Sequence, residues 1–141
     1  MQFSIRILTA ATALITVPAL SCAVAQADPT TDEVSFASPS GNIECLVTPT
    51  LAGCEISAHD YANPPGRDCP HSAYGDRLIM DSTGVQFPCH NDRLVGTTPG
   101  VLDYGHRVTV GGYTCLSTVD YVECSGGGHR FRLSRQSYSI D

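Results

Sequence analysis

The sequence contains no tryptophan and no lysine. All eight of its basic side chains are therefore arginines, against 14 acidic ones, and the formal charge at pH 7 is −6. Nucleic-acid binders carry a clustered basic face, so this composition argues against that class. No window shows a helical hydrophobic period of useful length, which excludes a fold built on long helices. Glycine and proline, at 13 and nine residues, favour a chain of many turns.

The segment 1–27 has the pattern of a secretory signal. Arg6 supplies the positive charge, residues 7–17 are apolar but too few to span a bilayer, and the segment ends in small residues up to Ala27. We expect cleavage after Ala27, which removes Arg6 and takes the formal charge to −7. An alternative is a lipid-modified chain beginning at Cys22, because the preceding residues loosely resemble a lipobox.

The expected organisation is a signal peptide at 1–27, a flexible tail at 28–33 and a single domain at 34–141. A chain of this size buries roughly two-thirds of its unfolded surface and forms one domain. We expect it to be secreted or associated with the cell envelope, with no transmembrane segment after the signal is removed.

Six cysteines remain after the signal, and an even number in a small exported domain indicates a disulfide framework. Six cysteines allow 15 pairings, and the sequence alone does not select one. Spacing nevertheless favours Cys45 with Cys54 and Cys115 with Cys124, since each pair lies within strand-like segments. That leaves Cys69 with Cys89 across a longer loop.

Alternating apolar and polar residues predict an all-β domain of about seven to nine short antiparallel strands with long ordered loops, either a sandwich or a barrel. Residues 59–77 contain several prolines and are expected to be an ordered loop held by Cys69. The two hairpins with equal cysteine spacing hint at an internal duplication, but their flanking residues match poorly. The expected strands are 34–36, 42–48, 54–57, 77–80, 85–87, 106–110, 113–116, 121–124 and 129–133.

The two ends of the domain carry recognisable motifs. Phe36-Ala-Ser-Pro-Ser-Gly-Asn-Ile-Glu-Cys45 lies near the start, and Gly128-His-Arg-Phe-Arg-Leu-Ser-Arg-Gln-Ser-Tyr138 follows Cys124 at the end. The domain resembles a family of small secreted actinobacterial proteins of unknown function, mycobacterial members included. Family members often have tryptophan where this chain has Tyr61 and Tyr74. The resemblance implies export and a disulfide-stapled β domain, but no activity.

One group of residues has the chemistry of a metal site. Cys69, His71, Cys89 and His90 offer two thiols and two imidazoles for zinc, but their spacing fits no known zinc finger and an oxidising compartment favours a disulfide. We therefore expect no metal and no cofactor.

Another group has the chemistry of a hydrolytic site. Ser134, His129 and Asp120 could supply a nucleophile, a base and an acid, yet no nucleophile elbow is present. Ser40-Gly41-Asn42 is better explained as turn chemistry. No catalytic residue is assigned.

His129, Arg130, Arg132 and Arg135 form the only positive cluster of the domain and are a possible anion-binding site. A solvent-exposed outer strand face explains the same residues. The tyrosines suit either a contact surface or the edge of a core. They are Tyr61, Tyr74, Tyr104, Tyr113, Tyr121 and Tyr138.

The sequence predicts an exported, non-catalytic module that binds an unidentified partner in the cell envelope or outside the cell. One alternative is a secreted hydrolase that uses His129. Another is a secreted protease inhibitor that presents the loop from Ala62 to Pro70 to an active site.

Overall fold

The computed structural model describes residues 32–141; the predicted signal at 1–27 and most of the predicted tail lie outside them. The described residues form eleven strands and no helix, so this part of the chain holds no helix that could cross a membrane. The strands are β1 (Val34–Ala37), β2 (Ile43–Val47), β3 (Ala52–Ile56), β4 (Arg77–Asp81), β5 (Gly84–Gln86), β6 (Gly100–Val101), β7 (Arg107–Val110), β8 (Tyr113–Ser117), β9 (Val122–Gly126), β10 (His129–Leu133) and β11 (Tyr138–Ile140).

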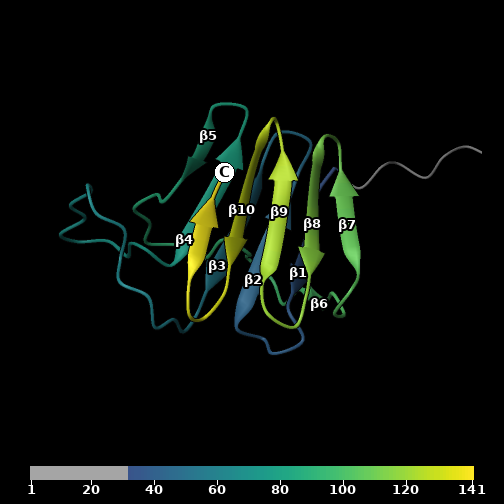
Figure 1. Cartoon of the computed structure of the whole chain (residues 1–141), viewed down its shortest axis with the longest axis horizontal. Coiled ribbons are helices and arrows are strands. Elements are labelled where there is room, and N and C mark those ends of the chain that lie inside the picture. Colours follow the sequence, from purple (N-terminus) through teal and green to yellow (C-terminus); the bar gives the residue numbers. More distant parts are fainter. Residues whose placement is uncertain (1–31) are drawn as a thin grey trace, which may run out of the picture.

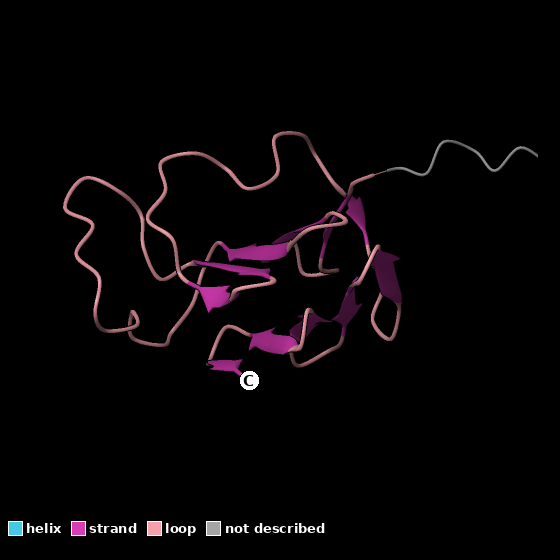
Figure 2. Ribbon diagram, turned by 90° about the horizontal axis from the view of Figure 1, so that it is seen from above, coloured by secondary structure: helices cyan, strands magenta, loops and turns pink. Residues whose placement is uncertain are grey.

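The strands form two separate sheets packed face to face, so the architecture is a sandwich and not a closed barrel (Figures 1 and 2). One sheet has the strand order β5-β4-β3-β2-β1-β6 and the other has the order β11-β10-β9-β8-β7. Alternate residues point inward, as they do in β2, where Ile43, Cys45 and Val47 are buried. The largest side chains of the core come from both sheets and include Leu78, Met80, Phe131 and Leu133.

Each sheet contains one five-stranded meander in which consecutive strands pair antiparallel, β1 to β5 in the first and β7 to β11 in the second. The central hairpins of the two meanders, β2–β3 and β8–β9, occupy corresponding positions. Their equivalent cysteines, Cys54 and Cys124, are 70 residues apart in the chain. Both hairpins turn through the same motif. Thr48 Oγ1 accepts from the N–H groups of Thr50 (3.2 Å) and Leu51 (3.1 Å), and Thr118 Oγ1 accepts from those of Asp120 (3.3 Å) and Tyr121 (3.0 Å). The two hairpins therefore share a cystine position and a turn motif, while a duplication of the sequence stays a prediction.

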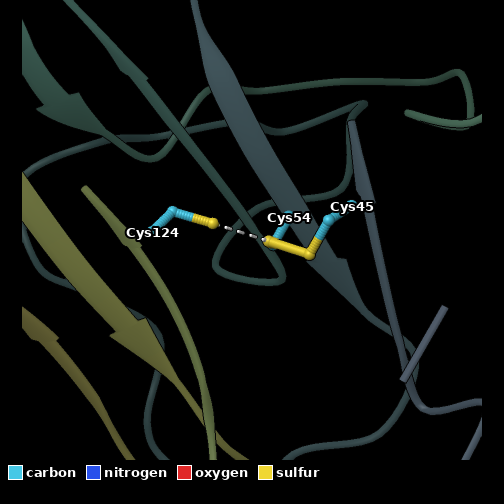
Figure 3. A group of neighbouring side chains, drawn as sticks. All are labelled: Cys45, Cys54 and Cys124. Carbon is cyan, nitrogen blue, oxygen red and sulfur yellow. Dashed lines mark hydrogen bonds between the residues drawn. A yellow bond between two sulfur atoms is a disulfide. The ribbon is translucent and has the colours of Figure 1, made fainter. Parts of the chain in front are cut away.

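The three predicted disulfides are confirmed. Cys45–Cys54 and Cys115–Cys124 each join directly opposite residues of neighbouring strands, with Cα atoms 4.1 Å apart. Cys54 Sγ lies 3.6 Å from Cys124 Sγ of the other sheet (Figure 3). Since both sulfurs belong to disulfides and carry no proton, this is a van der Waals contact. It places the two cystines against each other at the centre of the core.

The sequence did not predict two of the strands, β6 and β11. β6 has two residues, one of them Gly100, and it pairs with β1 in parallel, the one exception to the antiparallel expectation among residues 32–141. β11 has three residues after a Ser- and Arg-containing turn. Neither segment is long enough to show a period, and both form because a neighbouring strand offers unpaired backbone groups.

Candidate functional site

The two ends of the sandwich differ in how the turns of one sheet meet those of the other. At one end, here called the closed end, the β2–β3 turn packs directly on the β7–β8 turn. A Cβ atom on Gly111 would lie 2.8 Å from the Cα atom of Pro49, and Gly111 has a φ of 56°, so only glycine fits there. At the same end, a Cβ atom on Gly127 would lie 3.5 Å from the Cα atom of Ser82. The turns of the two sheets therefore lie in close contact at this end.

At the opposite end, here called the open end, the turns leave a groove between the sheets with a volume of about 550 Å³. Three turns line it: residues 38–42 after β1, 118–121 after β8 and 134–136 after β10, with Tyr104 beside them. A second hollow of about 390 Å³ shares Asp120, Tyr121, Ser134 and Gln136 with the groove. Loops gathered at one end of a rigid sandwich are a common place for a binding site.

The first turn of the groove is held rigid by its own side chains. Ser38 Oγ accepts from the N–H of Ile43 at 3.2 Å, and Ser40 Oγ accepts from that of Asn42 at 3.3 Å. The Asn42 amide donates to the carbonyl of Ala58 and accepts from its N–H, each at 2.9 Å. The predicted turn role of Ser40-Gly41-Asn42 is confirmed, with Gly41 at a φ of 73°.

The other two turns are fixed in the same manner. Thr118 Oγ1 holds the backbone of Asp120 and Tyr121, as described above. Ser134 Oγ donates to the carbonyl of Ser137 at 2.9 Å and accepts from the N–H of Ser137 at 3.0 Å. The frame of the groove is thus preorganised, and a ligand would not have to order it.

Several polar side chains of the groove are not used in this frame, among them four large ones. Asp120, Tyr104, Tyr121 and Gln136 make no side-chain hydrogen bond to any other residue of the described part. Arg132 lies over the Tyr121 ring, 4.6 Å from its centroid, and is itself paired with Glu123. The hydrogen bond that Arg132 donates to the Glu123 carboxylate raises the pKa of Arg132.

The residues of the predicted anion site do not form a free positive cluster. Arg130 and Arg132 project from the outer face of β10, as the alternation predicted. Each arginine of the set has a carboxylate partner: Asp141 at 3.5 Å for Arg130, Glu123 for Arg132 and Asp60 at 3.2 Å for Arg135. An anion would have to displace these carboxylates, so anion binding here stays a prediction without added support.

The residues of the hydrolase hypothesis are not brought together. Asp120 and Ser134 line the groove at the open end, but His129 begins β10 and Ser134 follows its last residue. At about 3.3 Å per residue, the strand separates them by on the order of 15 Å. His129 instead lies near Asp81 at the closed end. There the Thr83 hydrogen bonds, and less strongly the His129 charge, lower the pKa of Asp81.

The residues of the zinc hypothesis have other partners. Cys69 and Cys89 form a disulfide. The imidazole of His90 lies 2.9 Å from the Asp76 carboxylate and 3.1 Å from the Asp92 carbonyl. Within residues 32–141, the cysteine group with the closest metal-like geometry is Cys45, Cys54 and Cys124 (Figure 3). Those sulfurs are all in disulfides, which leaves no thiolate to act as a ligand.

The tyrosines separate into two groups. Tyr61, Tyr74 and Tyr138 join Phe87 in a row of edge-to-face contacts beside the long loops, with ring centroids 4.8 to 6.3 Å apart. Tyr61 donates its hydroxyl proton to the Gly75 carbonyl at 2.9 Å, and burial raises its pKa. These rings fill the core edge, and Tyr113 is buried. Only Tyr104 and Tyr121 face the groove.

An ionic cluster around the buried side chain of Arg77 anchors the long loops, and the sequence did not predict it. Arg77, 7% exposed in its side chain, donates to Glu55 at 2.7 Å through Nε and to Asp92 at 3.1 Å. The hydrogen bond from Arg77 lowers the pKa of Asp92. The cluster ties the loop after β5 to β3 and β4. Figure 2 shows the long loops extending beyond one side of the two layers. The sequence carries no local signal for this ionic cluster, because Arg77 lies 22 residues from Glu55 in the chain.

The chain matches no family model, no curated protein and no solved structure. Its three disulfides are typical of extracellular proteins.

Proposed function

We propose that the chain is an exported, non-catalytic binding module whose partner, in the cell envelope or outside the cell, occupies the groove at the open end. The observation that carries this proposal is a contrast between the turns of the groove and the side chains that they present. Its turns are fixed by internal hydrogen bonds, whereas Asp120, Tyr104, Tyr121 and Gln136 remain available for a ligand. Rigid turns that present unsatisfied side chains are what a binding site needs.

Export is part of the proposal and has two supports. The segment before Asp28 has the pattern of a secretory signal. Three disulfides stabilise a domain without tryptophan, and they persist only where thiols oxidise. The resemblance to secreted actinobacterial proteins agrees with both.

Binding without catalysis is favoured by the chemistry of the groove. The residues that line it include no histidine and no cysteine. Ser134 is the candidate nucleophile of the hydrolase hypothesis, yet its hydroxyl already donates its proton to the Ser137 carbonyl. A serine without a base to activate it is a weak nucleophile.

The proposal is tested by retention on envelope material. The full chain is expressed with its own leader, recovered after export, and mixed with washed envelopes or with spent-medium polymers of the source organism. We expect the wild type to be retained by one fraction, and Asp120→Asn and Tyr104→Ala to lower retention about tenfold, which is the effect of one lost charged hydrogen bond or aromatic contact.

Two matched variants serve as controls. Asp68→Asn removes an exposed carboxylate of the β3–β4 loop, and Ile140→Ala removes a side chain 43% exposed, close to the 41% of Tyr104. Both should bind like the wild type. Binding to neither fraction, or equal binding by all four variants, would contradict the proposal.

Protease inhibition is a second candidate, favoured by one observation. Arg67 is exposed in the β3–β4 loop, two residues before the Cys69–Cys89 disulfide, and it makes no ion pair with any described residue. An exposed arginine on a disulfide-held loop is suited to a trypsin-like specificity pocket. We expect tight inhibition of such a protease that Arg67→Ala abolishes. Cleavage after Arg67 without a lasting complex would contradict this candidate.

A further inference from the structure

We infer that the groove binds a neutral saccharide, with a hydroxyl pair of the sugar on the Asp120 carboxylate and a sugar ring stacked on Tyr104 or Tyr121. This inference rests on the proposed function and names the ligand class of the same site. It is carried by the charge of the groove, by its donors and acceptors, by its aromatic rings and by the satisfied backbone of its turns.

The charge of the groove favours a ligand without negative charge. Asp120 makes no ion pair within the described residues, whereas the nearby cation, Arg135, is paired with Asp60 at 3.2 Å. The chain as a whole has a formal charge of −6. An anionic polymer or a phosphate placed beside Asp120 would meet an uncompensated carboxylate, and like charges at contact distance disfavour binding.

The available polar groups match the hydroxyls of a sugar. An ionised carboxylate only accepts hydrogen bonds and has two oxygens, so it can accept from two adjacent hydroxyls at once. The Gln136 amide both donates and accepts, as do the hydroxyls of Tyr104 and Tyr121. A sugar hydroxyl also both donates and accepts hydrogen bonds. These side chains can therefore bond it whether it acts as donor or as acceptor.

Tyr121 is held as a stacking surface. Arg132 covers its ring from the side of the second hollow, at 4.6 Å from the centroid. Tyr121 also lines the groove, so a ligand there can contact its ring. The C–H-bearing face of a pyranose is apolar and packs on an aromatic ring, while the hydroxyls at its rim stay hydrated or bonded. Tyr104, 41% exposed, offers a second ring.

A peptide fits the groove less well. A peptide added as a strand needs a row of unpaired backbone groups, but the turns of the groove use theirs internally. The N–H of Ser38 bonds the carbonyl of Ile43, that of Thr118 bonds Tyr121, and that of Ser134 bonds Ser137. A docked helix needs an apolar groove, and Val119, 76% exposed, is the only exposed aliphatic side chain among the lining residues.

The test is a glycan array probed with the exported full-length protein, followed by NMR titration with the trisaccharide that binds most strongly. The array holds neutral glucose, mannose and N-acetylglucosamine oligomers beside acidic ones such as trigalacturonate. We expect binding to at least one neutral oligomer, weakened about tenfold or more by Asp120→Asn and by at least one of Tyr104→Ala and Tyr121→Ala. Asp68→Asn and Ile140→Ala should bind like the wild type. Amide shifts should move in residues 38–42 and 118–121.

The results separate this inference from the proposed function. If no neutral oligomer binds at about 10 mM while Asp120→Asn still lowers envelope retention, the saccharide inference is wrong and the binding module stands. Preference for acidic oligomers, or for a lysine-rich peptide added to the array, overturns the inference in the same way. If the groove variants change neither glycan binding nor envelope retention, the proposed function falls as well.

Discussion

The two five-stranded meanders follow one plan and differ in what connects their strands. In the second meander, β7 to β8 and β9 to β10 are joined by turns of two residues, 111–112 and 127–128. In the first, β1 to β2 is joined by the five residues 38–42, and β3 to β4 by the loop 57–76. The strands and both central cystines are alike, so the differences lie in the connections.

The lengths of these connections explain why the sandwich has one closed and one open end. The short β7–β8 turn lets Gly111 lie directly against Pro49 at one end. The longer β1–β2 turn occupies the corresponding place at the other end, opposite the β8–β9 turn, and the groove lies between them. The two meanders thus share a strand framework, and the longer β1–β2 turn lines the groove, whereas the short β7–β8 turn at the closed end does not.

The largest predicted effect tests whether the two central cystines are equivalent. Replacing Cys45 and Cys54 with alanine should lower the free energy of unfolding by about 3 to 5 kcal/mol, and so should replacing Cys115 and Cys124. Both disulfides close loops of the same length at fully buried positions. Chemical denaturation measures both losses. The two losses of unfolding free energy should be similar. If they differed by about 3 kcal/mol or more, the two cystines would not be equivalent.

A smaller effect separates two arginines at corresponding strand positions. Arg77 precedes Leu78 in β4 as Arg130 precedes Phe131 in β10. Arg77→Gln should cost about 2 to 3 kcal/mol, because it leaves Glu55 without its partner at a partly buried site. Arg130→Gln should cost less than about 0.5 kcal/mol, since its partner Asp141 is exposed.

Denaturant unfolding of both arginine variants measures the difference, and limited proteolysis locates it. In Arg77→Gln, cleavage should increase in the two long loops and not in the β9–β10 turn. Equal destabilisation by the two variants would show that the ionic cluster does not anchor the loops.

A gain in stability is predicted for a buried serine in the second meander. Ser117 corresponds to Val47 of the first, and its Oγ is buried without a hydrogen-bond partner among the described residues. Ser117→Ala should raise the free energy of unfolding by about 1 kcal/mol, because an unsatisfied hydroxyl is removed from the core. Ser125→Ala, at an exposed position of β9, is the matched control and should be neutral. A loss of stability in Ser117→Ala would mean that the hydroxyl has a partner.

Local patterns in the sequence predicted most of the framework. Alternation located nine of the eleven strands of the described part, and equal spacing predicted the pairing of Cys45 with Cys54 and of Cys115 with Cys124. Both signals act between residues that are close in the chain. Strands of two or three residues, such as β6 and β11, carry no such period.

The groove could not be predicted because it depends on long-range placement. In the sequence, Asp120, His129 and Ser134 are simply neighbours in the chain, since strand direction is unknown at that level. The structure shows that β10 carries His129 to the closed end and Ser134 to the open end. The Asn42 side chain donates a hydrogen bond to the backbone carbonyl of Ala58, which follows the next two strands along the chain. Such contacts have no local signature in the sequence.

The most direct test of the central claim, that the open end binds the partner, is an NMR map of the exported protein mixed with the envelope polymer that retains it. Backbone amide shifts should change in the turns at 38–42, 118–121 and 134–137. The amide shifts should not change at the closed end, in the turns at 48–51 and 111–112. These turns belong to the same two meanders but do not line the groove. Shifts concentrated at the closed end or along an edge strand would contradict the account.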